Sequence, residues 1–301
     1  MTASQENLRG TLRFNEPMTR HTSWRVGGAA EKFYAPADIE DMAEYLKQLP
    51  ADEPVTLIGL GSNLLVRDGG IRGSVICPTS VMNGFEIESD HTLRVEAGVP
   101  CAIVAKRLAK EDYNGLEFLA GIPGTVGGAL AMNAGAFGGE TWDHVDHVET
   151  LDRHGNRTIR QRDEYVIGYR SVIGPQPTEL EEWFVSAWFT LNRVTDEQTS
   201  QQRIKELLAR RAATQPTGIP SCGSVFRNPE GDHAARLIEA CGLKGLRMGD
   251  AQVSEKHANF ILNLGKAKAA DIERLIIHVM QTVKQKHDVD LESEVRIVGE
   301  A

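Results

Sequence analysis

The glycine-rich stretch "LAGIPGTVGGALAMNAGAFGGE", residues 119–140, is the segment that decides the fold of this chain. A stretch of the same kind, "GLGSNLLVRDGGIRG", lies earlier in the chain at residues 59–73; it is the first glycine-rich stretch, and residues 119–140 are the second. A glycine carries no Cβ, so the main chain can take a positive φ there or approach another group closely. Ordinary β-turns would explain either stretch alone. Two of them in one chain favour a main chain that surrounds a flat, extended ligand.

The first stretch does not fit the two common nucleotide-binding motifs. The Rossmann fingerprint needs a third glycine where this chain has Leu64, and a Walker A loop would end in Gly-Lys-Ser/Thr. Gly59 and Gly61 still leave main-chain N–H groups unobstructed beside the Ser62 hydroxyl and the Asn63 amide. Such a loop could surround a diphosphate without the help of a helix dipole.

Length and charge narrow the class of protein. The 301 residues are enough for two domains of ordinary size. The formal net charge of −9 argues against nucleic acid, because phosphate backbones are bound by clustered Lys and Arg. The N-terminus has no secretory pattern, and no stretch approaches the ~20 apolar residues of a membrane span. We therefore expect a cytoplasmic protein that binds neither nucleic acid nor membrane.

The spacing of the four cysteines does not indicate a set of disulfide bonds or a metal site. Cys77, Cys101, Cys222 and Cys241 lie far apart, without the CxxC or Cys/His spacing of a metal site. In a chain of this size they are typical of reduced, mostly buried thiols. The sequence predicts no disulfides and no metal.

Alternating helix and strand patterns lead up to the second glycine-rich stretch. Residues 38–50 predict a helix capped by Asp38 and stopped by Pro50, with a strand at 55–58. Residues 91–99 predict a strand, and residues 100–115 predict a helix closed by Asn114 and Gly115.

The remainder of the chain changes character near residue 195. Residues 145–191 are β-rich, with a turn at "RHGNR". Beyond a polar junction the pattern is mainly helical, and it ends in a strand-like segment. We place a domain boundary near residue 195. The three predicted helices cover residues 203–213, 234–242 and 271–287, and the final strand lies within 294–300.

These features together resemble the UDP-N-acetylenolpyruvoylglucosamine reductase (MurB) family. The resemblance rests on motifs in the family's order that together span almost the whole chain, which is far more specific than one glycine loop. The short join between "WFTLNRV" and the helix at residue 204 resembles the compact second subtype of the family. The motifs are the two glycine-rich stretches, "TSWRVGG" at 22–28, "IGYRSV" at 167–172, "PSCGSVFRNP" at 220–229 and "LESEVRIVG" at 291–299.

The resemblance implies an α+β fold and its cofactor. The fold is the FAD-binding fold of the vanillyl-alcohol oxidase type. Residues 1–195 would form an FAD-binding domain of two α+β subdomains that divide near residues 80–90. Residues 196–301 would form an α+β substrate domain, whose last residues could return to the first subdomain. The implied FAD contacts are Gly59, Gly61, Ser62, Asn63, Leu64, Gly121, Ile122, Pro123, Gly124, Gly127, Gly128, Asn133, Ala134 and Gly135.

The implied reaction uses NADPH and FAD to reduce the enolpyruvyl ether of UDP-GlcNAc-enolpyruvate to UDP-N-acetylmuramate, a precursor of peptidoglycan. Hydride addition to the terminal methylene leaves negative charge on the neighbouring carbon and its carboxylate, so the site must stabilise an enolate and then protonate it. By family position Arg170 would grip that carboxylate with its planar guanidinium. Residue type alone would make Arg170 a surface arginine that neutralises Asp163 or Glu164.

Family position also assigns two further catalytic residues. Ser224 would donate the proton, because an enolate is basic enough to take it from a hydroxyl. Glu294 would be protonated, or share a proton, and donate a hydrogen bond to the enolate. In a strand Glu292 shares the face of Glu294, so the residues alone do not separate them.

The UDP group requires cationic and amide side chains in the substrate domain. Candidates are Arg227, Asn228, Lys256 and His257, with Asn259 in the same cluster. His257 alone would more often be a hydrogen-bonded structural histidine.

Two other functions remain open at this stage. One is an oxidase of the same flavin fold, which would often tether its flavin to a His or Cys. His21 and Cys101 offer no obvious tether. The other is a non-catalytic flavin- or nucleotide-binding module, against which the presence of all three chemical positions argues.

Overall fold

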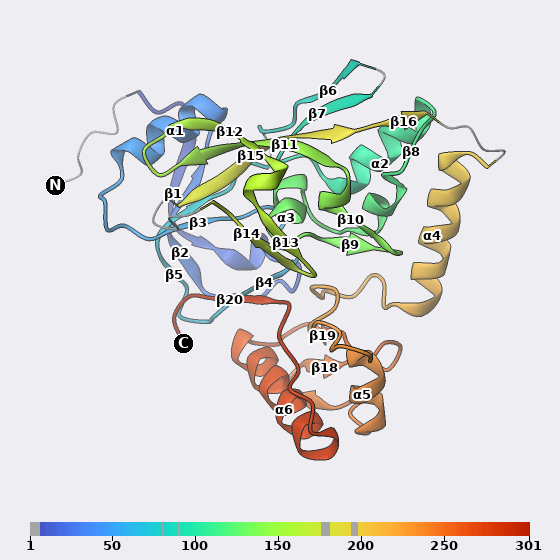
Figure 1. Cartoon of the computed structure of the whole chain (residues 1–301). Helices are drawn as coiled ribbons and strands as arrows, with labels where there is room; N and C mark the ends of the chain where they lie inside the picture. The colour runs from blue at the N-terminus through green and yellow to red at the C-terminus, as the bar shows by residue number, and fades with distance from the viewer. Residues whose placement is uncertain (1–6, 80, 90, 176–180, 194–197) are drawn as a thin grey trace. The chain divides into compact units, whose positions relative to one another are not determined.

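The computed structural model describes residues 7–79, 81–89, 91–175, 181–193 and 198–301 (Figure 1). They form two compact units. The first comprises the described residues of Met1–Arg13, Phe33–Gly59 and Ser74–Ala209, and the second comprises Phe14–Lys32, Leu60–Gly73 and Arg210–Ala301. The predicted boundary near residue 195 and the short join that suggested the subtype fall at residues 194–197, outside the described residues.

A five-stranded antiparallel sheet organises the first unit. Its order is β12-β11-β15-β7-β6, with β11 paired to both β12 and β15 (Figure 1). The β-rich pattern predicted for residues 145–191 is thus confirmed. The five strands are β6 (Phe85–Ser89), β7 (Thr92–Glu96), β11 (Val145–Asp152), β12 (Arg157–Gln161) and β15 (Glu182–Thr190).

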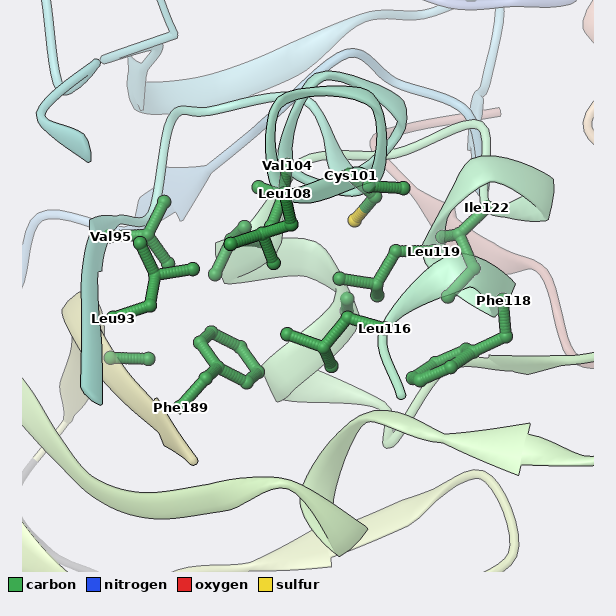
Figure 2. Packing of buried hydrophobic residues seen from close by; sticks show 14 of the residues in the cluster. Leu93, Val95, Cys101, Val104, Leu108, Leu116, Phe118, Leu119, Ile122 and Phe189 are labelled. Carbon is green, nitrogen blue, oxygen red and sulfur yellow. The ribbon is translucent and has the colours of Figure 1, made fainter. Parts of the chain in front are cut away.

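The core of this unit lies between the sheet and helix α2 (Cys101–Lys110) (Figure 2). Cys101, Val104 and Leu108 share one face of the helix, because residues three and four apart lie together on a helix surface. They pack in one cluster with Leu93 of β7 and Phe189 of β15. The cluster also includes Leu119, Ile122 and Ala134, so the core itself fixes the path of the second glycine-rich stretch.

Leu93 provides a test of this core. Its side chain is fully buried in the cluster, so Leu93→Ala is expected to lower the free energy of unfolding by about 2–5 kcal/mol. Ile159 on β12 of the same sheet is 48% exposed, and Ile159→Ala should change stability by less than about 0.5 kcal/mol. Urea unfolding followed by circular dichroism measures both. Equal losses in the two variants would contradict the proposed packing.

Helix α1 (Ile39–Gln48) confirms the predicted cap. The Asp38 carboxylate accepts a hydrogen bond from the Asp41 main-chain N–H at 2.8 Å. The prediction that the next helix continues to Asn114 is wrong, because α2 ends at Lys110. Asp112 has a φ of +58° there, and Tyr113–Asn114 form strand β8, which pairs with β16 (Asn192–Arg193) far along the chain.

Further short elements complete the first unit. Helix α3 (Val126–Ala131) and the hairpin of β13 (Val166–Gly168) and β14 (Ser171–Ile173) carry site residues. The others are β3 (Val55–Leu57), β9 (Gly135–Ala136) and β10 (Gly139–Glu140), with single 3-10 turns at Glu117–Gly121, Thr141–Asp143 and Arg162–Glu164.

The second unit is built on a small sheet, β17-β18-β19, with helices α5 (Ala234–Ala240) and α6 (Ala269–His287). Helix α6 confirms the pattern of residues 271–287 and buries Ile272, Leu275 and Val279. Strand β20 (Arg296–Val298), the predicted final strand, runs parallel to β4 (Leu64–Val66). The three sheet strands are β17 (Arg247–Met248), β18 (Ala251–Val253) and β19 (Ile261–Asn263).

Some elements have residues in both units. They are three strands of the four-stranded sheet β1-β2-β5-β3, namely β1 (Thr11–Pro17), β2 (Ala29–Ala35) and β5 (Ile71–Ile76), and helix α4 (Ser200–Thr214). In the part of the chain that the structure describes, no helix combines the length and the hydropathy needed to span a membrane. A 3-10 turn at Met18–Arg20 directly follows strand β1.

Candidate functional site

The second glycine-rich stretch is held by the main chain that links β7 to α2. Gly127 donates its N–H to the Ala97 carbonyl at 2.8 Å, and Cys101 donates to the Gly124 carbonyl at 3.0 Å. Thr125 caps α3 by accepting from the Gly128 N–H at 3.4 Å. The stretch is therefore a fixed loop leading into a short helix.

Protein atoms account for several of the close approaches that glycine allows. A Cβ on Gly61, whose φ is +62°, would lie 2.0 Å from the His21 carbonyl oxygen. One on Gly121 would lie 2.4 Å from the Phe137 ring. At Gly128 a Cβ would meet only the Thr125 hydroxyl oxygen, at 3.8 Å. Gly128 thus differs from the other two, because its main chain is open to another molecule.

The other predicted FAD contacts differ in accessibility. Ile122, Gly124, Asn133 and Ala134 are buried, whereas Pro123 is exposed. Asn133, with a φ of +45°, is almost fully buried. Its side chain accepts from the Trp142 N–H at 3.1 Å and donates to the Glu140 carboxylate at 2.8 Å. The Asn133 amide therefore anchors the loop to its own unit.

Arg170 lies directly beside this loop. Its guanidinium donates to the carbonyls of Asn133 at 3.1 Å and Gly135 at 3.0 Å. Arg170 occupies the turn between β13 and β14 with a φ of +54°, a conformation that costs a non-glycine residue about 1–3 kcal/mol. A two-residue turn normally places Gly or Asn at such a position, so the backbone at Arg170 is strained.

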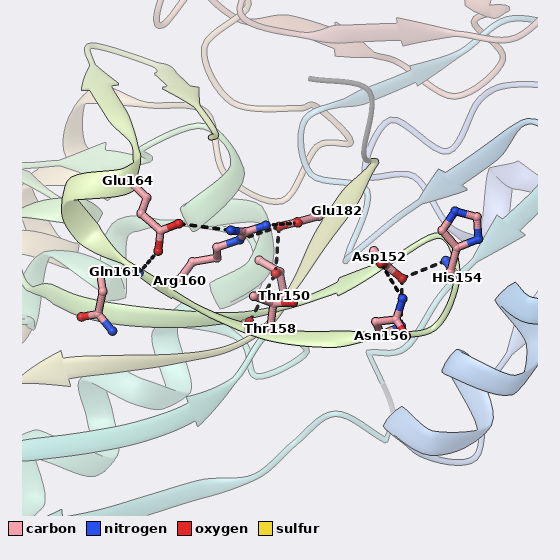
Figure 3. A network of polar contacts seen from close by, with 9 residues as sticks. All are labelled: Thr150, Asp152, His154, Asn156, Thr158, Arg160, Gln161, Glu164 and Glu182. Atoms are coloured by element: carbon pink, nitrogen blue, oxygen red, sulfur yellow. Dashed lines mark hydrogen bonds and ion pairs between the residues drawn. The ribbon is translucent and has the colours of Figure 1, made fainter. Parts of the chain in front are cut away.

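Of the two alternative partners of Arg170, Asp163 and Glu164, the latter is bonded to another arginine. Arg160 donates to the Glu164 carboxylate at 3.1 Å and to Glu182 at 2.5 Å (Figure 3). Thr150 also donates to Glu182, at 2.9 Å. This network stabilises the edge of the five-stranded sheet, while the guanidinium of Arg170 bonds to the glycine-rich stretch.

In the second unit the Ser224 segment and the Glu294 segment lie side by side. The Glu294 N–H donates to the Val225 carbonyl at 2.8 Å, and the Arg227 N–H donates to the Glu292 carbonyl at 2.9 Å. Phe226 and Ser293 form the antiparallel bridge between these two bonds. Ser224 and Glu294, both half-buried, are therefore brought together from segments far apart in the sequence.

The first glycine-rich stretch joins the same cluster. The Asn63 amide donates to the Glu294 carbonyl at 2.9 Å, and the Arg296 N–H donates to the Asn63 carbonyl at 3.1 Å. The Cys222 thiol contacts the Leu64 carbonyl at 3.6 Å. Asn63 and Leu64 thus bond to the segments that carry Glu294 and Ser224, whereas Gly59 belongs to the first unit.

The structure separates the two glutamates that the strand pattern could not. Glu292 has a side chain that is 72% exposed and lies 3.5 Å from the Arg227 guanidinium. Glu294 is half-buried, and its main chain is bonded to Val225 and Asn63. Of the two glutamates, only Glu294 is partly shielded from solvent.

The four predicted substrate contacts lie in the second unit with different surroundings. The Asn228 side chain accepts from the Ala234 N–H at 3.1 Å and so caps α5. Exposed Lys256 donates to the Ala212 carbonyl at 2.5 Å. Burial lowers the pKa of His257, whose Nδ1 is buried and has no hydrogen-bond partner in the described structure. Arg227 carries the ion pair with Glu292.

All four cysteines are free thiols, and all except Cys77 are buried. Burial raises the pKa of Cys101 and of Cys222 to about 12, so both are protonated at neutral pH. Cys101 is fully buried at the start of α2, where a covalent flavin link would not be accessible. His21 lies 2.9 Å from the Glu16 carboxylate.

Two family models and several known proteins match this chain. Residues 30–159 match the model of an FAD-binding domain, and residues 215–298 match that of the UDP-N-acetylenolpyruvoylglucosamine reductase C-terminal domain. A UDP-N-acetylenolpyruvoylglucosamine reductase of Methylococcus capsulatus is 57% identical, over 97% of this chain and 95% of the relative. A second reductase, from Alkalilimnicola ehrlichii, is 54% identical over 100% of this chain and 99% of the relative.

A solved structure gives the same result. The crystal structure of the reductase from Thermus caldophilus superimposes with a TM-score of 0.80 at 31% identity, and the match covers 96% of this chain and 99% of that one. The predicted α+β fold with an FAD-binding domain is therefore confirmed.

Proposed function

The chain belongs to the UDP-N-acetylenolpyruvoylglucosamine reductase family of FAD-binding oxidoreductases, and from this premise we propose that it reduces UDP-GlcNAc-enolpyruvate to UDP-N-acetylmuramate with electrons from NADPH. The product would serve peptidoglycan synthesis in the cytoplasm. The observation that carries the proposal is the pairing of the Ser224 and Glu294 segments through the 2.8 Å bond from Glu294 N–H to the Val225 carbonyl.

The glycine-rich stretches would hold FAD, and the chemistry that the bound cofactor would supply is hydride transfer from NADPH to the terminal methylene of the enolpyruvyl group. The chain must then stabilise the enolate and deliver a proton. Ser224 donates that proton from its hydroxyl to the carbon that bears the carboxylate. Glu294, as the protonated acid or through a shared proton, donates a hydrogen bond to the enolate oxygen.

Arg170 binds the substrate carboxylate. A guanidinium has five N–H donors in a planar array, and two of its nitrogens already bond the glycine-rich stretch. Those bonds fix the orientation of the side chain, so it meets the carboxylate without a further loss of rotamer freedom. The UDP group is bound by Arg227, Asn228, Lys256 and His257. The positive charges of Arg227 and Lys256 pair with the negatively charged diphosphate.

The open main chain at Gly128 fits FAD, which needs close approach along its length. Gly128→Ala is expected to keep or raise the stability of the FAD-free chain by up to about 1 kcal/mol, because alanine favours the helix. The added methyl should still weaken FAD binding by about tenfold or more, the cost of overpacking a contact. FAD titration by fluorescence and urea unfolding measure the two effects.

Gly61→Ala is the matched control. Its Cβ would clash with the His21 carbonyl, so stability should fall before any FAD effect appears. A Gly128→Ala chain that binds FAD as well as the unchanged chain would contradict the assignment of this contact.

Anaerobic mixing tests the function itself. NADPH should bleach the flavin absorbance near its visible maximum, and added UDP-GlcNAc-enolpyruvate should restore it with formation of UDP-N-acetylmuramate. An oxidase of this fold would recover with oxygen and not with the enolpyruvyl substrate. A binding module would not bleach with NADPH, and a flavin that bleaches but never recovers with the substrate would refute the proposal.

A further inference from the structure

The Ser224 segment has a second partner besides the Glu294 segment. Asn259 is only 4% exposed, and its side-chain amide pairs with both main-chain groups of Phe226. Its Oδ1 accepts from the Phe226 N–H at 2.9 Å, and its Nδ2 donates to the Phe226 carbonyl at 2.8 Å. The Asn259 main-chain carbonyl also accepts from the Val225 N–H at 2.9 Å.

These bonds replace the neighbouring strand that the segment lacks on this side. A strand in a sheet would offer Phe226 one acceptor and one donor, and the Asn259 carboxamide supplies both. On the other side Glu294 bonds the Val225 carbonyl, and Glu292 bonds the Arg227 N–H. Residues 225–227 are therefore held from two directions by hydrogen bonds to their main chain.

We propose that Asn259 is a positioning residue for the reaction, which holds Ser224 and Arg227 in register with Glu294. This inference rests on the proposed function of Ser224. Ser224 is one peptide bond from Val225, whose N–H is bonded to Asn259 and whose carbonyl is bonded to Glu294. The same carboxamide fixes Phe226, the neighbour of Arg227, so one side chain sets the proton donor and a diphosphate-binding residue together.

Proton delivery is the step most sensitive to such positioning. A misplacement of about 1 Å at a reacting group can cost about 100-fold in rate. Loss of the Asn259 bonds would release residues 225–227 on one side while Glu294 still holds them on the other. The hydroxyl of Ser224 would then sample positions away from the substrate carbon, and binding of the UDP group would weaken through Arg227.

Asn259→Asp tests this with little change of volume. The aspartate keeps an acceptor for the Phe226 N–H but removes the Nδ2 donor to the Phe226 carbonyl. In the FAD-loaded protein reduced with dithionite, recovery of flavin absorbance on mixing with saturating UDP-GlcNAc-enolpyruvate should slow by about 10- to 100-fold. The limiting rate of bleaching by NADPH should stay close to that of the unchanged chain.

Asn263→Asp is the matched control. Asn263 is equally buried at 4% exposure, but its amide bonds the Trp24 carbonyl and the N–H groups of Gly265 and Ala267. It does not contact residues 224–227 through these bonds. Its substitution should lower stability without a selective loss of the recovery step.

Hydrogen exchange gives a readout independent of activity. The amides of Val225, Phe226 and Arg227 are all hydrogen-bonded, and in Asn259→Asp a peptide containing them should exchange faster, whereas in Asn263→Asp it should not. If Asn259→Asp does not fold, Asn259→Ser, which retains one polar group, is measured in the same way.

The inference fails if Asn259→Asp and Asn259→Ser recover at the rate of the unchanged chain, or if Asn263→Asp loses the recovery step equally. Failure of the proposed function has a different signature, because the unchanged chain would then not recover with the substrate at all.

Discussion

Ser224→Ala is expected to slow the substrate-dependent recovery of flavin absorbance by about 10²- to 10⁴-fold, the range typical of a lost general acid. Reduction by NADPH should be unaffected, because that half of the reaction does not require a proton from Ser224. Stopped-flow absorbance under anaerobic conditions measures the two half-reactions separately.

Ser221→Ala provides the control for Ser224. Ser221 lies in the same loop, three residues before the proposed donor, and like Ser224 it is half-buried. Its loss should leave both half-reactions close to their original rates. If the two variants behave alike, or if Ser224→Ala recovers normally, another group donates the proton.

The second large effect is expected at Glu294. Glu294→Ala should slow recovery by about 10²- to 10³-fold, as for a lost donor to a developing oxyanion. Glu294→Gln should retain clearly more activity, because the glutamine amide can still donate a hydrogen bond. Equal losses in the two variants would count against hydrogen-bond donation as the role of Glu294.

Glu292→Gln is the matched control for these variants. Its side chain is 72% exposed and paired with Arg227 at 3.5 Å, so the expected change is confined to substrate affinity. A loss of the limiting recovery rate at Glu292 that equals the loss at Glu294 would mean that the wrong glutamate has been assigned.

Local sequence signals predicted the parts of the fold that depend on nearby residues. The Asp38 cap of α1 and the periodicity of α6 involve residues a few positions apart, and both are confirmed. The end of α2 was predicted wrongly, because Tyr113–Asn114 pair with Asn192–Arg193. A pairing between segments so distant leaves no trace in the local pattern and overrides helix propensity.

The same limit applies to the candidate site. Strand periodicity places Glu292 and Glu294 on one face, and only the register against residues 225–227 distinguishes them. Asn259 was grouped with the UDP contacts, yet its amide is used by Phe226. A buried asparagine that completes a main-chain pairing and one that binds a ligand have the same sequence signal, so the structure was needed to tell them apart.

The central claim is that Ser224, Glu294 and Arg170 act on one substrate beside one flavin. Its most direct test is a crystal structure of the protein with FAD and UDP-GlcNAc-enolpyruvate bound. We expect the Ser224 hydroxyl, the Glu294 carboxyl and the Arg170 guanidinium within about 2.6–3.2 Å of the enolpyruvyl group or one water away. An enolpyruvyl group bound away from the flavin ring, or with these three side chains on separate surfaces, would contradict the account.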